Sequence, residues 1–149
     1  MDGTTGDAAA LLRFFEDGIP FNAWLGMRVE RFERSPGSGR VAVRVPFRPE
    51  LVGDIRRPAL HGGVLSALAD TAGGLAVFAG VDDPLQSRIS TVDLLVDYLR
   101  PGKLEDLVCE AEVLRMGNRV AVAQMVVRQG DHVPAQARGV YNVVRATDP

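Results

Sequence analysis

The sequence predicts an α+β fold in which a curved antiparallel β-sheet wraps around one central buried α-helix. The helix is predicted by residues 63–79, where apolar side chains fall on nearly every side, a pattern typical of a buried helix. The sheet is predicted by six segments with strand patterning, separated by short turns. Because the chain has only 149 residues, we expect residues 1–149 to form one domain, with residues 1–25 as an N-terminal helical extension.

The first part of the chain is predicted to contain that extension and a β-hairpin. Residues 1–7 are small and polar, and we expect them to fray. Residues 8–17 carry leucines and phenylalanines at helical spacing before a glycine, and residues 21–25 predict one further turn. Residues 27–34 and 40–45 have strand patterning on either side of a Ser-Pro-Gly-Ser-Gly turn, which predicts a hairpin.

The rest of the chain is predicted to contain the central helix and four strands. A loop with prolines and arginines, residues 47–60, leads into the helix, and an Asp-Asp-Pro sequence at residues 82–84 ends it. The regular spacing and short turns of the last strands indicate an antiparallel meander. These strands are expected at residues 87–99, 107–116, 119–129 and 135–145.

The composition excludes several classes of function. With 17 basic and 19 acidic residues, no overall field favours nucleic acid or an anionic membrane. The first residues lack the pattern of a signal peptide, and no apolar run approaches the roughly 18 residues of a membrane span. The single cysteine, Cys109, cannot close an intrachain disulfide and is interpreted as a core thiol. We therefore expect a cytoplasmic protein without a metal site.

Asp70 is the residue that points most clearly to chemistry. It lies inside the apolar helix, where Ser66 and Thr71 are the only other polar side chains from residue 64 to residue 79. A hydroxyl can bond back to the helix, whereas an unpaired buried carboxylate is costly and Asp is a poor residue inside a helix. We interpret Asp70 as functional; its structural alternatives are capping a neighbouring loop or pairing with an arginine.

The start of the same helix has the features of an anion site. His61, Gly62 and Gly63 precede its apolar run. Amides at a helix N-terminus lack intrahelical partners and carry the positive end of the dipole, and glycines let a ligand approach closely. Such amides can hold an anion or a developing oxyanion. A plain glycine turn is the structural alternative, and His61 is more readily interpreted as a loop or capping residue than as a base.

The spacing of these two features predicts an assembly. Gly62 and Asp70 are eight residues apart, which is about 12 Å along a helix axis. Even with side chains leaning towards the N-terminus, one chain cannot bring this amide and this carboxylate to the same carbonyl. If both belong to one site, one of them comes from a second subunit. A dimer with two shared sites is therefore expected.

Several segments resemble hotdog-fold acyl-CoA thioesterases of the phenylacetate-degradation type. The clearest is residues 61–74, His-Gly-Gly-Val-Leu-Ser-Ala-Leu-Ala-Asp-Thr-Ala-Gly-Gly. The similarity continues through residues 90–94, 98–102 and 115–120, and it spans roughly residues 26–144. A histidine, two glycines, an acid nine residues after the histidine and a Tyr-Leu-Arg-Pro strand end make a fairly specific combination.

The resemblance implies a hotdog fold that dimerises edge to edge and often pairs again into a tetramer. It implies hydrolysis of a small, medium-chain or aryl acyl-CoA to the free acid and CoA, without a cofactor. Asp70 matches the family's general base or nucleophile. The partner subunit's Gly62 would polarise the thioester carbonyl through its amide, and the Thr91 hydroxyl would help to hold the water.

The resemblance also implies roles for residues around that centre. His61 and Gly63 would support the loop before the helix, and Arg119 and Arg100 are candidates for binding the phosphates of CoA. One position departs from the family, in which many members carry Asn or Gln six or seven residues before the histidine. Here Ile55 and Asp54 occupy those places.

The departure bears on the rate of hydrolysis and leaves the expected fold unchanged. Isoleucine cannot donate a hydrogen bond, and an ionised Asp54 would repel an oxyanion. A protonated or water-linked Asp54 could still support the site, since two nearby carboxylates raise the pKa of one of them.

Two other functions stay open beside the thioesterase. A non-catalytic acyl-CoA-binding hotdog protein is favoured slightly by Asp54, whereas Asp70, Gly62 and Thr91 argue against it. A hotdog hydratase or dehydratase needs a histidine and an acid placed for proton transfer, and the nine-residue spacing from His61 to Asp70 fits that less well. The sequence does not distinguish acyl groups, CoA from carrier-protein thioesters, or dimer from tetramer.

Overall fold

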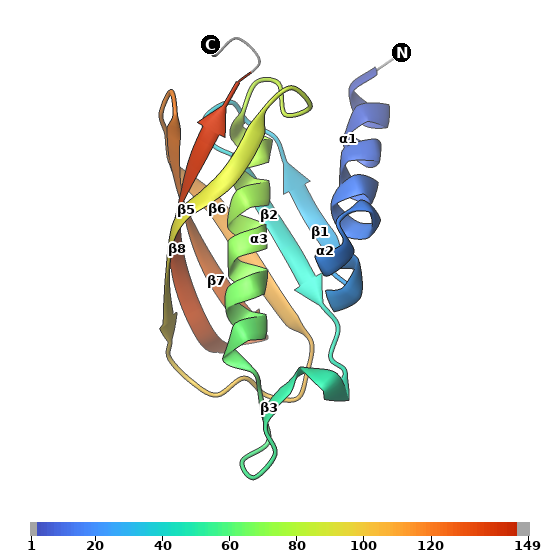
Figure 1. The fold of residues 1–149 in the computed structure, drawn as a ribbon, viewed down its shortest axis with the longest axis vertical. Coiled ribbons are helices and arrows are strands. Elements are labelled where there is room, and N and C mark those ends of the chain that lie inside the picture. Colours follow the sequence, from blue (N-terminus) through green and yellow to red (C-terminus); the bar gives the residue numbers. More distant parts are fainter. Residues whose placement is uncertain (1–2, 146–149) are drawn as a thin grey trace.

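The central helix α3 (Gly62–Gly80) lies on the inner face of a curved six-stranded antiparallel sheet (Figure 1). This computed structural model describes residues 3–145. The N-terminal helices α1 (Gly3–Arg13) and α2 (Pro20–Leu25) lie beside the sheet and are joined by a π-helical turn, η1 (Phe14–Gly18). The predicted α+β architecture is confirmed. The strands are β1 (Arg28–Glu33), β2 (Arg40–Val45), β5 (Arg88–Tyr98), β6 (Leu107–Met116), β7 (Val120–Gln129) and β8 (His132–Val144).

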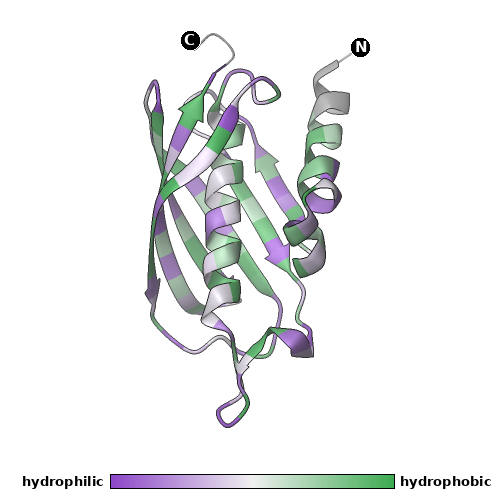
Figure 2. Ribbon diagram, in the orientation of Figure 1, coloured by the Kyte–Doolittle hydropathy of each residue, from purple (hydrophilic) through white to green (hydrophobic). Residues whose placement is uncertain are grey.

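The alternation of side chains determines which face of each strand packs on the helix. In β2, Val41, Val43 and Val45 are almost completely buried, while the arginines between and beside them lie on the outer face. Burial alternates in a similar way along β6, β7 and β8, and Figure 2 shows apolar and polar bands on the strands of the sheet. Both β2 and β6 begin and end at the residues that the sequence predicts.

The N-terminal extension is more ordered than the sequence indicates. Helix α1 begins at Gly3, so the expected fraying is wrong from Gly3 onwards, and the first two residues of the chain lie outside its described part. The extension packs against the rest of the domain through Phe15, which belongs to the hydrophobic core. It also bonds to the sheet, because the Glu16 carboxylate accepts a 2.7 Å hydrogen bond from the backbone N–H of Val29 in β1. Residues 14–25 therefore form part of the wall around α3.

The strand order differs from the predicted four-strand meander. The order is β1-β2-β6-β7-β8-β5, so β5 pairs with β8 at the sheet edge and β6 pairs with β2. Only β6, β7 and β8 form the expected meander. Strands β5 and β6 are three spacings apart, about 14 Å at roughly 4.8 Å each, and the eight residues 99–106 can span about 26 Å. Their Arg-Pro-Gly sequence is thus part of a crossover and not a hairpin turn.

The loop before α3 has structure that the sequence did not predict. It contains a 3₁₀ turn, η2 (Pro49–Leu51), and a small ribbon of β3 (Val52–Asp54) with β4 (Ala59–Leu60). A hydrogen bond connects the two ends of this ribbon: the backbone N–H of His61 donates to the Leu51 carbonyl at 2.8 Å. These bonds fix the direction in which the chain enters α3.

Helix α3 is long and apolar enough to cross a membrane by length and composition, contrary to the expectation that no apolar run has that length. It is the core helix of this fold, however, and 56% of its most apolar window is buried inside the protein. Leu68, Ala72 and Ala76 are fully buried against the sheet. On the opposite side a stripe containing Asp70, Gly74 and other residues is only partly covered, and this open stripe positions the candidate site.

Candidate active site

Asp70 and Thr91 meet where α3 passes β5. The Thr91 hydroxyl donates a 2.7 Å hydrogen bond to Oδ1 of the Asp70 carboxylate. Asp70 lies on the partly covered stripe of α3 and is half-buried. The carboxylate is thus hydrogen-bonded and open to a ligand, which is a less costly position than the full burial expected from the apolar helix.

A cleft of about 250 Å³ opens beside this pair. Its polar lining includes Asp70 and Thr91 and also Asn22, whose side-chain amide donates a 2.9 Å hydrogen bond to the Phe15 carbonyl. Most of the remaining lining is apolar and comes from three parts of the chain. The apolar residues are Phe15, Ile19, Leu75, Phe78 and Ile89. The N-terminal extension thus forms one wall of the candidate site, which the sequence pattern did not indicate.

Tyr141 supports the helix turn that carries Asp70. Its hydroxyl donates a 3.0 Å hydrogen bond to the Asp70 backbone carbonyl, and its side chain is almost completely buried. Burial, and then the negative charge of Asp70, raise the pKa of Tyr141 well above its usual range. The phenol therefore stays protonated and remains a donor at physiological pH.

Tyr141 lies in a slot that glycines make. A Cβ atom on Gly73 would lie 2.1 Å from the Tyr141 hydroxyl oxygen, and one on Gly139 would lie 2.5 Å from the ring. No real side chain fits at those distances, so the glycines are required for the tyrosine to pack. Sequence reasoning missed this residue, since it is 71 positions from Asp70 and its strand pattern shows only that it faces the core.

At the start of α3, some of the backbone amides already have a hydrogen-bond acceptor, and one does not. His61 is the N-cap, and its Nδ1 accepts a 2.8 Å hydrogen bond from Gly63 N–H. With Nδ1 as acceptor, the neutral ring carries its proton on Nε2. The Val64 amide donates to the His61 carbonyl at 2.9 Å, whereas the Gly62 amide, at the first helical position, has no intrahelical acceptor.

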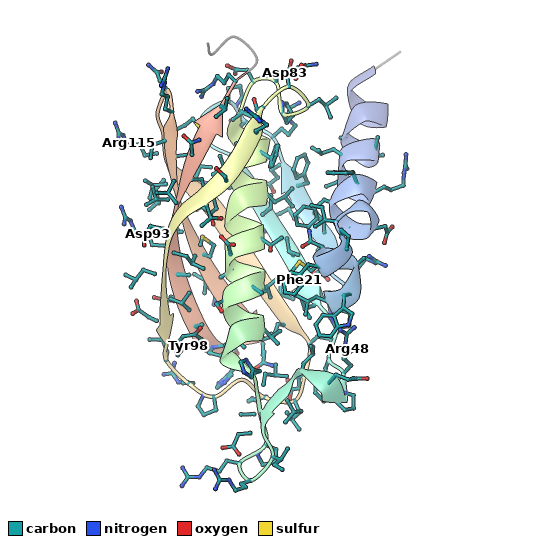
Figure 3. The ribbon with its side chains drawn as sticks, in the orientation of Figure 1. Phe21, Arg48, Asp83, Asp93, Tyr98 and Arg115 are labelled. Carbon is teal, nitrogen blue, oxygen red and sulfur yellow. The ribbon has the colours of Figure 1, made fainter. Side chains whose placement is uncertain are left out.

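Tyr98, at the end of β5, covers the other side of this helix start (Figure 3). Its hydroxyl donates a 3.3 Å hydrogen bond to the Gly62 carbonyl, and a Cβ on Gly62 would lie 3.2 Å from its ring. A second cleft, of about 290 Å³, adjoins Gly62 and Tyr98 and includes Arg100. Gly62 and Asp70 therefore adjoin different clefts of one chain.

Asp54 lies away from Asp70. It ends β3, and its Oδ1 accepts hydrogen bonds from the amides of Arg56 and Arg57 at 2.8 and 3.2 Å, which closes the tip of the ribbon. Ile55, beside it, is 87% exposed. Neither side chain lines the cleft that contains Asp70. Within one chain, therefore, the two residues that differ from the family pattern, Asp54 and Ile55, do not line the cleft beside the Asp70 carboxylate.

Arg100 and Arg119 lie towards opposite ends of β5. Arg100 follows the strand's last residue, Tyr98, by two positions. Arg119 immediately precedes β7, whose first residue, Val120, is in register with Asn142 of β8, which in turn pairs with Ser90 near the start of β5. Both arginines are exposed, so one chain does not place the two candidate phosphate ligands together.

Cys109 is fully buried in the core, and burial raises the pKa of its thiol far above the usual range. The thiol is therefore neutral at neutral pH, and since the thiolate is the reactive form, we expect the folded protein to show no thiol that reacts rapidly with a disulfide reagent. Titration in buffer and in denaturant tests this: one thiol should appear only on unfolding. Rapid labelling of the folded chain would contradict it.

Within residues 3–145, no group of three or more His, Cys, Asp and Glu side chains is placed to hold a metal ion.

Comparison with known proteins identifies the family of this chain. Residues 58–135 match the model of the thioesterase superfamily. A putative esterase of Halobacterium salinarum is 36% identical, covering 93% of this chain and 94% of that protein. The medium/long-chain acyl-CoA thioesterase YigI of Escherichia coli is 38% identical, covering 72% and 74%.

Solved structures agree with these sequence matches. A protein of Shewanella oneidensis related to the thioesterase superfamily superposes with a TM-score of 0.82 at 30% identity, covering 95% of this chain and 99% of that one. The phenylacetate-degradation subtype stays a prediction. The family match includes α3, β5, β6 and β7. This chain therefore belongs to the thioesterase superfamily, and it is a thioester hydrolase with a hotdog fold.

Proposed function

We propose that the protein hydrolyses acyl-CoA thioesters to the free acid and CoA, with Asp70 as the reacting carboxylate. The observation that carries the proposal is the 2.7 Å hydrogen bond from Thr91 to Asp70 beside a largely apolar cleft of about 250 Å³. Such a cleft provides space for an acyl chain next to a group that can activate water. The similarity to YigI, whose name gives medium/long-chain acyl-CoA as its substrate, supports the choice of CoA thioesters.

Asp70 has two possible roles in the reaction. As general base it takes a proton from the water that attacks the thioester carbon; as nucleophile it attacks that carbon itself, and water then opens the resulting anhydride. In both routes the carbon–sulfur bond breaks, and CoA leaves as a thiolate that takes up a proton. In this proposal the Thr91 hydroxyl orients the carboxylate in either case, and its oxygen would help to hold the water.

The negative charge that develops on the carbonyl oxygen needs a donor, which we assign to Gly62. His61 accepts the hydrogen bonds of Gly63 and Val64, so the Gly62 amide is left for a ligand at the positive end of α3. One well-placed donor to an oxyanion contributes about 3–4 kcal/mol to the lowering of the barrier. In this assignment His61 and Gly63 hold the helix start in place, and Asp54 holds the loop before it.

The separation of Asp70 and Gly62 supports a shared site in a homodimer. Strand β5 is an edge strand whose second edge pairs with no other strand within residues 3–145, and it exposes Val92 and Leu95 by 64% and 57%. A long, apolar, unpaired edge is a template for pairing with another strand. We assign this edge to the dimer interface.

We infer a register for that dimer from the contacts along β5. Thr91 lies at Asp70, and Tyr98 lies at Gly62. If two β5 strands pair antiparallel about a two-fold axis at Leu95, then Thr91 lies within one residue of the position opposite the partner subunit's Tyr98. Asp70 consequently lies near the partner subunit's Gly62, and each dimer has two equivalent sites.

The same pairing would bring the two candidate arginines to one site. Arg119 lies beside the end of β5 that contains Ser90, and Arg100 lies beyond Tyr98 at the other end. In the antiparallel dimer, Arg119 of one subunit and the partner subunit's Arg100 flank the same thioester, where they could bind the phosphates of CoA. A further pairing of dimers into a tetramer is compatible with this arrangement.

The packing of the N-terminal extension supports a single domain. We propose that residues 1–149 are one domain, because Phe15 and Leu25 of the N-terminal extension belong to the same core cluster as α3 and the sheet. The cytoplasmic location stays a prediction.

The experiment that tests the proposed activity is thioester hydrolysis over a panel of acyl-CoAs, followed by release of the free thiol. The proposal predicts turnover that saturates with acyl-CoA and produces equal amounts of acid and CoA. Binding of acyl-CoA without turnover would contradict it and would favour the non-catalytic acyl-CoA-binding protein. Running the same acyl groups on a carrier protein tests the choice of CoA.

A substitution in the proposed interface tests whether turnover needs the dimer while the chain itself stays folded. Leu95→Glu puts two carboxylates near the two-fold axis, and like charges opposite each other on neighbouring strands are destabilising. We expect a folded monomer by light scattering and circular dichroism, with turnover reduced at least about tenfold because the site is shared. Leu114→Glu is the matched control, since Leu114 is 53% exposed on β6. A dimeric Leu95→Glu protein with full turnover would contradict the assigned interface.

A further inference from the structure

One glycine on the open stripe of α3 is not required by the packing. At Gly73 a Cβ would lie 2.1 Å from the Tyr141 hydroxyl, so that glycine is fixed by the fold. At Gly74, the next residue, the single nearby atom is a ring carbon of Tyr141 at 3.6 Å, which is an ordinary contact distance. An alanine would therefore fit at Gly74, and it would be more favourable than glycine inside a helix.

The space beside Gly74 belongs to the cleft that contains Asp70. Asp70, Gly74 and Phe78 follow one another at intervals of four residues, so they lie on one face of α3. All three line the cleft, together with Phe15 and Ile19 on the opposite wall. A side chain at position 74 would project into the cleft about 6 Å along the helix axis from Asp70.

The lining changes along this direction. Asp70 has the Thr91 hydroxyl beside it, whereas the lining residues that lie further towards the C-terminal end of α3 are apolar: Leu75, Phe78 and Ile89. A thioester with its carbonyl at Asp70 would thus direct its hydrocarbon chain across Gly74. From Asp70 to Phe78 is about 12 Å along the axis, the length of an extended chain of roughly nine carbons.

We propose that Gly74 determines the acyl-chain specificity of this enzyme, because its missing side chain leaves the passage from Asp70 to an apolar pocket that Phe78 closes. The proposal rests on the proposed function, since it takes Asp70 as the position of the thioester. The substrate class is a straight acyl chain of medium length, which passes over Gly74 and ends against Phe78.

Two substitutions with opposite expected effects test this proposal. Gly74→Leu fills the passage, so kcat/KM for octanoyl- and decanoyl-CoA should fall at least about tenfold, while acetyl- and butyryl-CoA, which end before the blocked turn, should be hydrolysed within about twofold of the wild-type rate. Phe78→Ala opens the far end and should shift the preferred chain to greater length. The short substrates provide the internal control for each variant.

Gly74→Ala supplies a second readout. It adds one methyl group in the passage and removes a glycine from the helix interior, so it should raise Tm by about 2–4 °C while lowering kcat/KM for the medium chains relative to the short ones. A merely structural glycine would give the rise in Tm without the change in chain-length preference.

Binding of non-hydrolysable acyl-CoA thioethers separates this proposal from the proposed catalysis. For the wild type, affinity should increase with chain length up to about eight or nine carbons, and Gly74→Leu should abolish that increase. Chain-length-dependent binding without turnover would leave the passage in place and contradict the catalytic role of Asp70. A parallel loss for all chain lengths in Gly74→Leu, or an unchanged profile, would overturn the role of Gly74.

Discussion

Replacing Asp70 with asparagine is expected to lower kcat/KM for acyl-CoA hydrolysis by about two orders of magnitude or more, the usual contribution of a general base. The change removes the negative charge and the ability to take up a proton, and it keeps the shape of the side chain. The amide oxygen of the introduced asparagine would still accept the hydrogen bond that Thr91 donates at 2.7 Å to the carboxylate. The rates of wild type and Asp70→Asn, measured side by side by thiol release, test this expectation.

The matched control for that experiment is Asp83→Asn. Asp83 lies in the exposed segment that follows α3, away from the start of the helix and from Tyr98 (Figure 3), and the same chemical change there should leave the rate unchanged. Equal turnover by wild type and Asp70→Asn would eliminate Asp70 as the reacting carboxylate. Slow turnover by both proteins, with measurable binding of acyl-CoA, would favour the non-catalytic alternative.

Replacing Gly62 with proline is expected to lower kcat by about 10²- to 10³-fold, because it removes the proposed oxyanion donor. Proline has no N–H, and it is well tolerated at the first position of a helix, which Gly62 occupies. The residue before a proline must be extended, and His61 already has φ −63° and ψ 130°. The helix should therefore form as before, and steady-state kinetics with a measurement of Tm separate catalysis from folding.

Gly62→Ala is the control for the added atoms of that proline. Its Cβ would lie 3.2 Å from the Tyr98 ring, a tight contact that the exposed ring can relieve by a small shift. Because alanine keeps the N–H, its rate should stay within a few-fold of the wild-type rate. Wild-type turnover by Gly62→Pro would contradict the donor assignment. Equal losses for the two variants would assign the effect to crowding at Tyr98.

The elements whose pattern is local could be predicted from the sequence. The alternating valines and arginines of β2 and the apolar run of α3 determine which side of each element is buried, and both were located to within one residue or better. The order of the strands could not be predicted in this way. The position of β5 beside β8 depends on contacts between residues 37 to 56 positions apart, such as Tyr98 with Ala135 and Arg88 with Val144. An Arg-Pro-Gly sequence is equally compatible with a tight turn and a crossover.

The same distinction between local patterns and contacts of distant residues applies to the candidate site. Asp70, Gly62 and Thr91 can be proposed from the sequence because a carboxylate in an apolar helix, a glycine pair at its start and the family resemblance are all visible there. Tyr141 was missed because its strand pattern shows that it faces the core and does not show what its hydroxyl bonds. The wall formed by residues 14–22 was missed because an amphipathic extension does not reveal its own docking position.

In the proposed dimer, each active site takes Asp70 from one subunit and Gly62 from the other. Equal amounts of Asp70→Asn and Gly62→Pro subunits should be mixed, allowed to exchange and checked for mixed dimers by native mass spectrometry. A shared site predicts recovery to about a quarter of wild-type activity, since half of the dimers are mixed and each has one intact site. If mixed dimers form and activity stays at the level of the separate variants, the two residues do not act in a shared site.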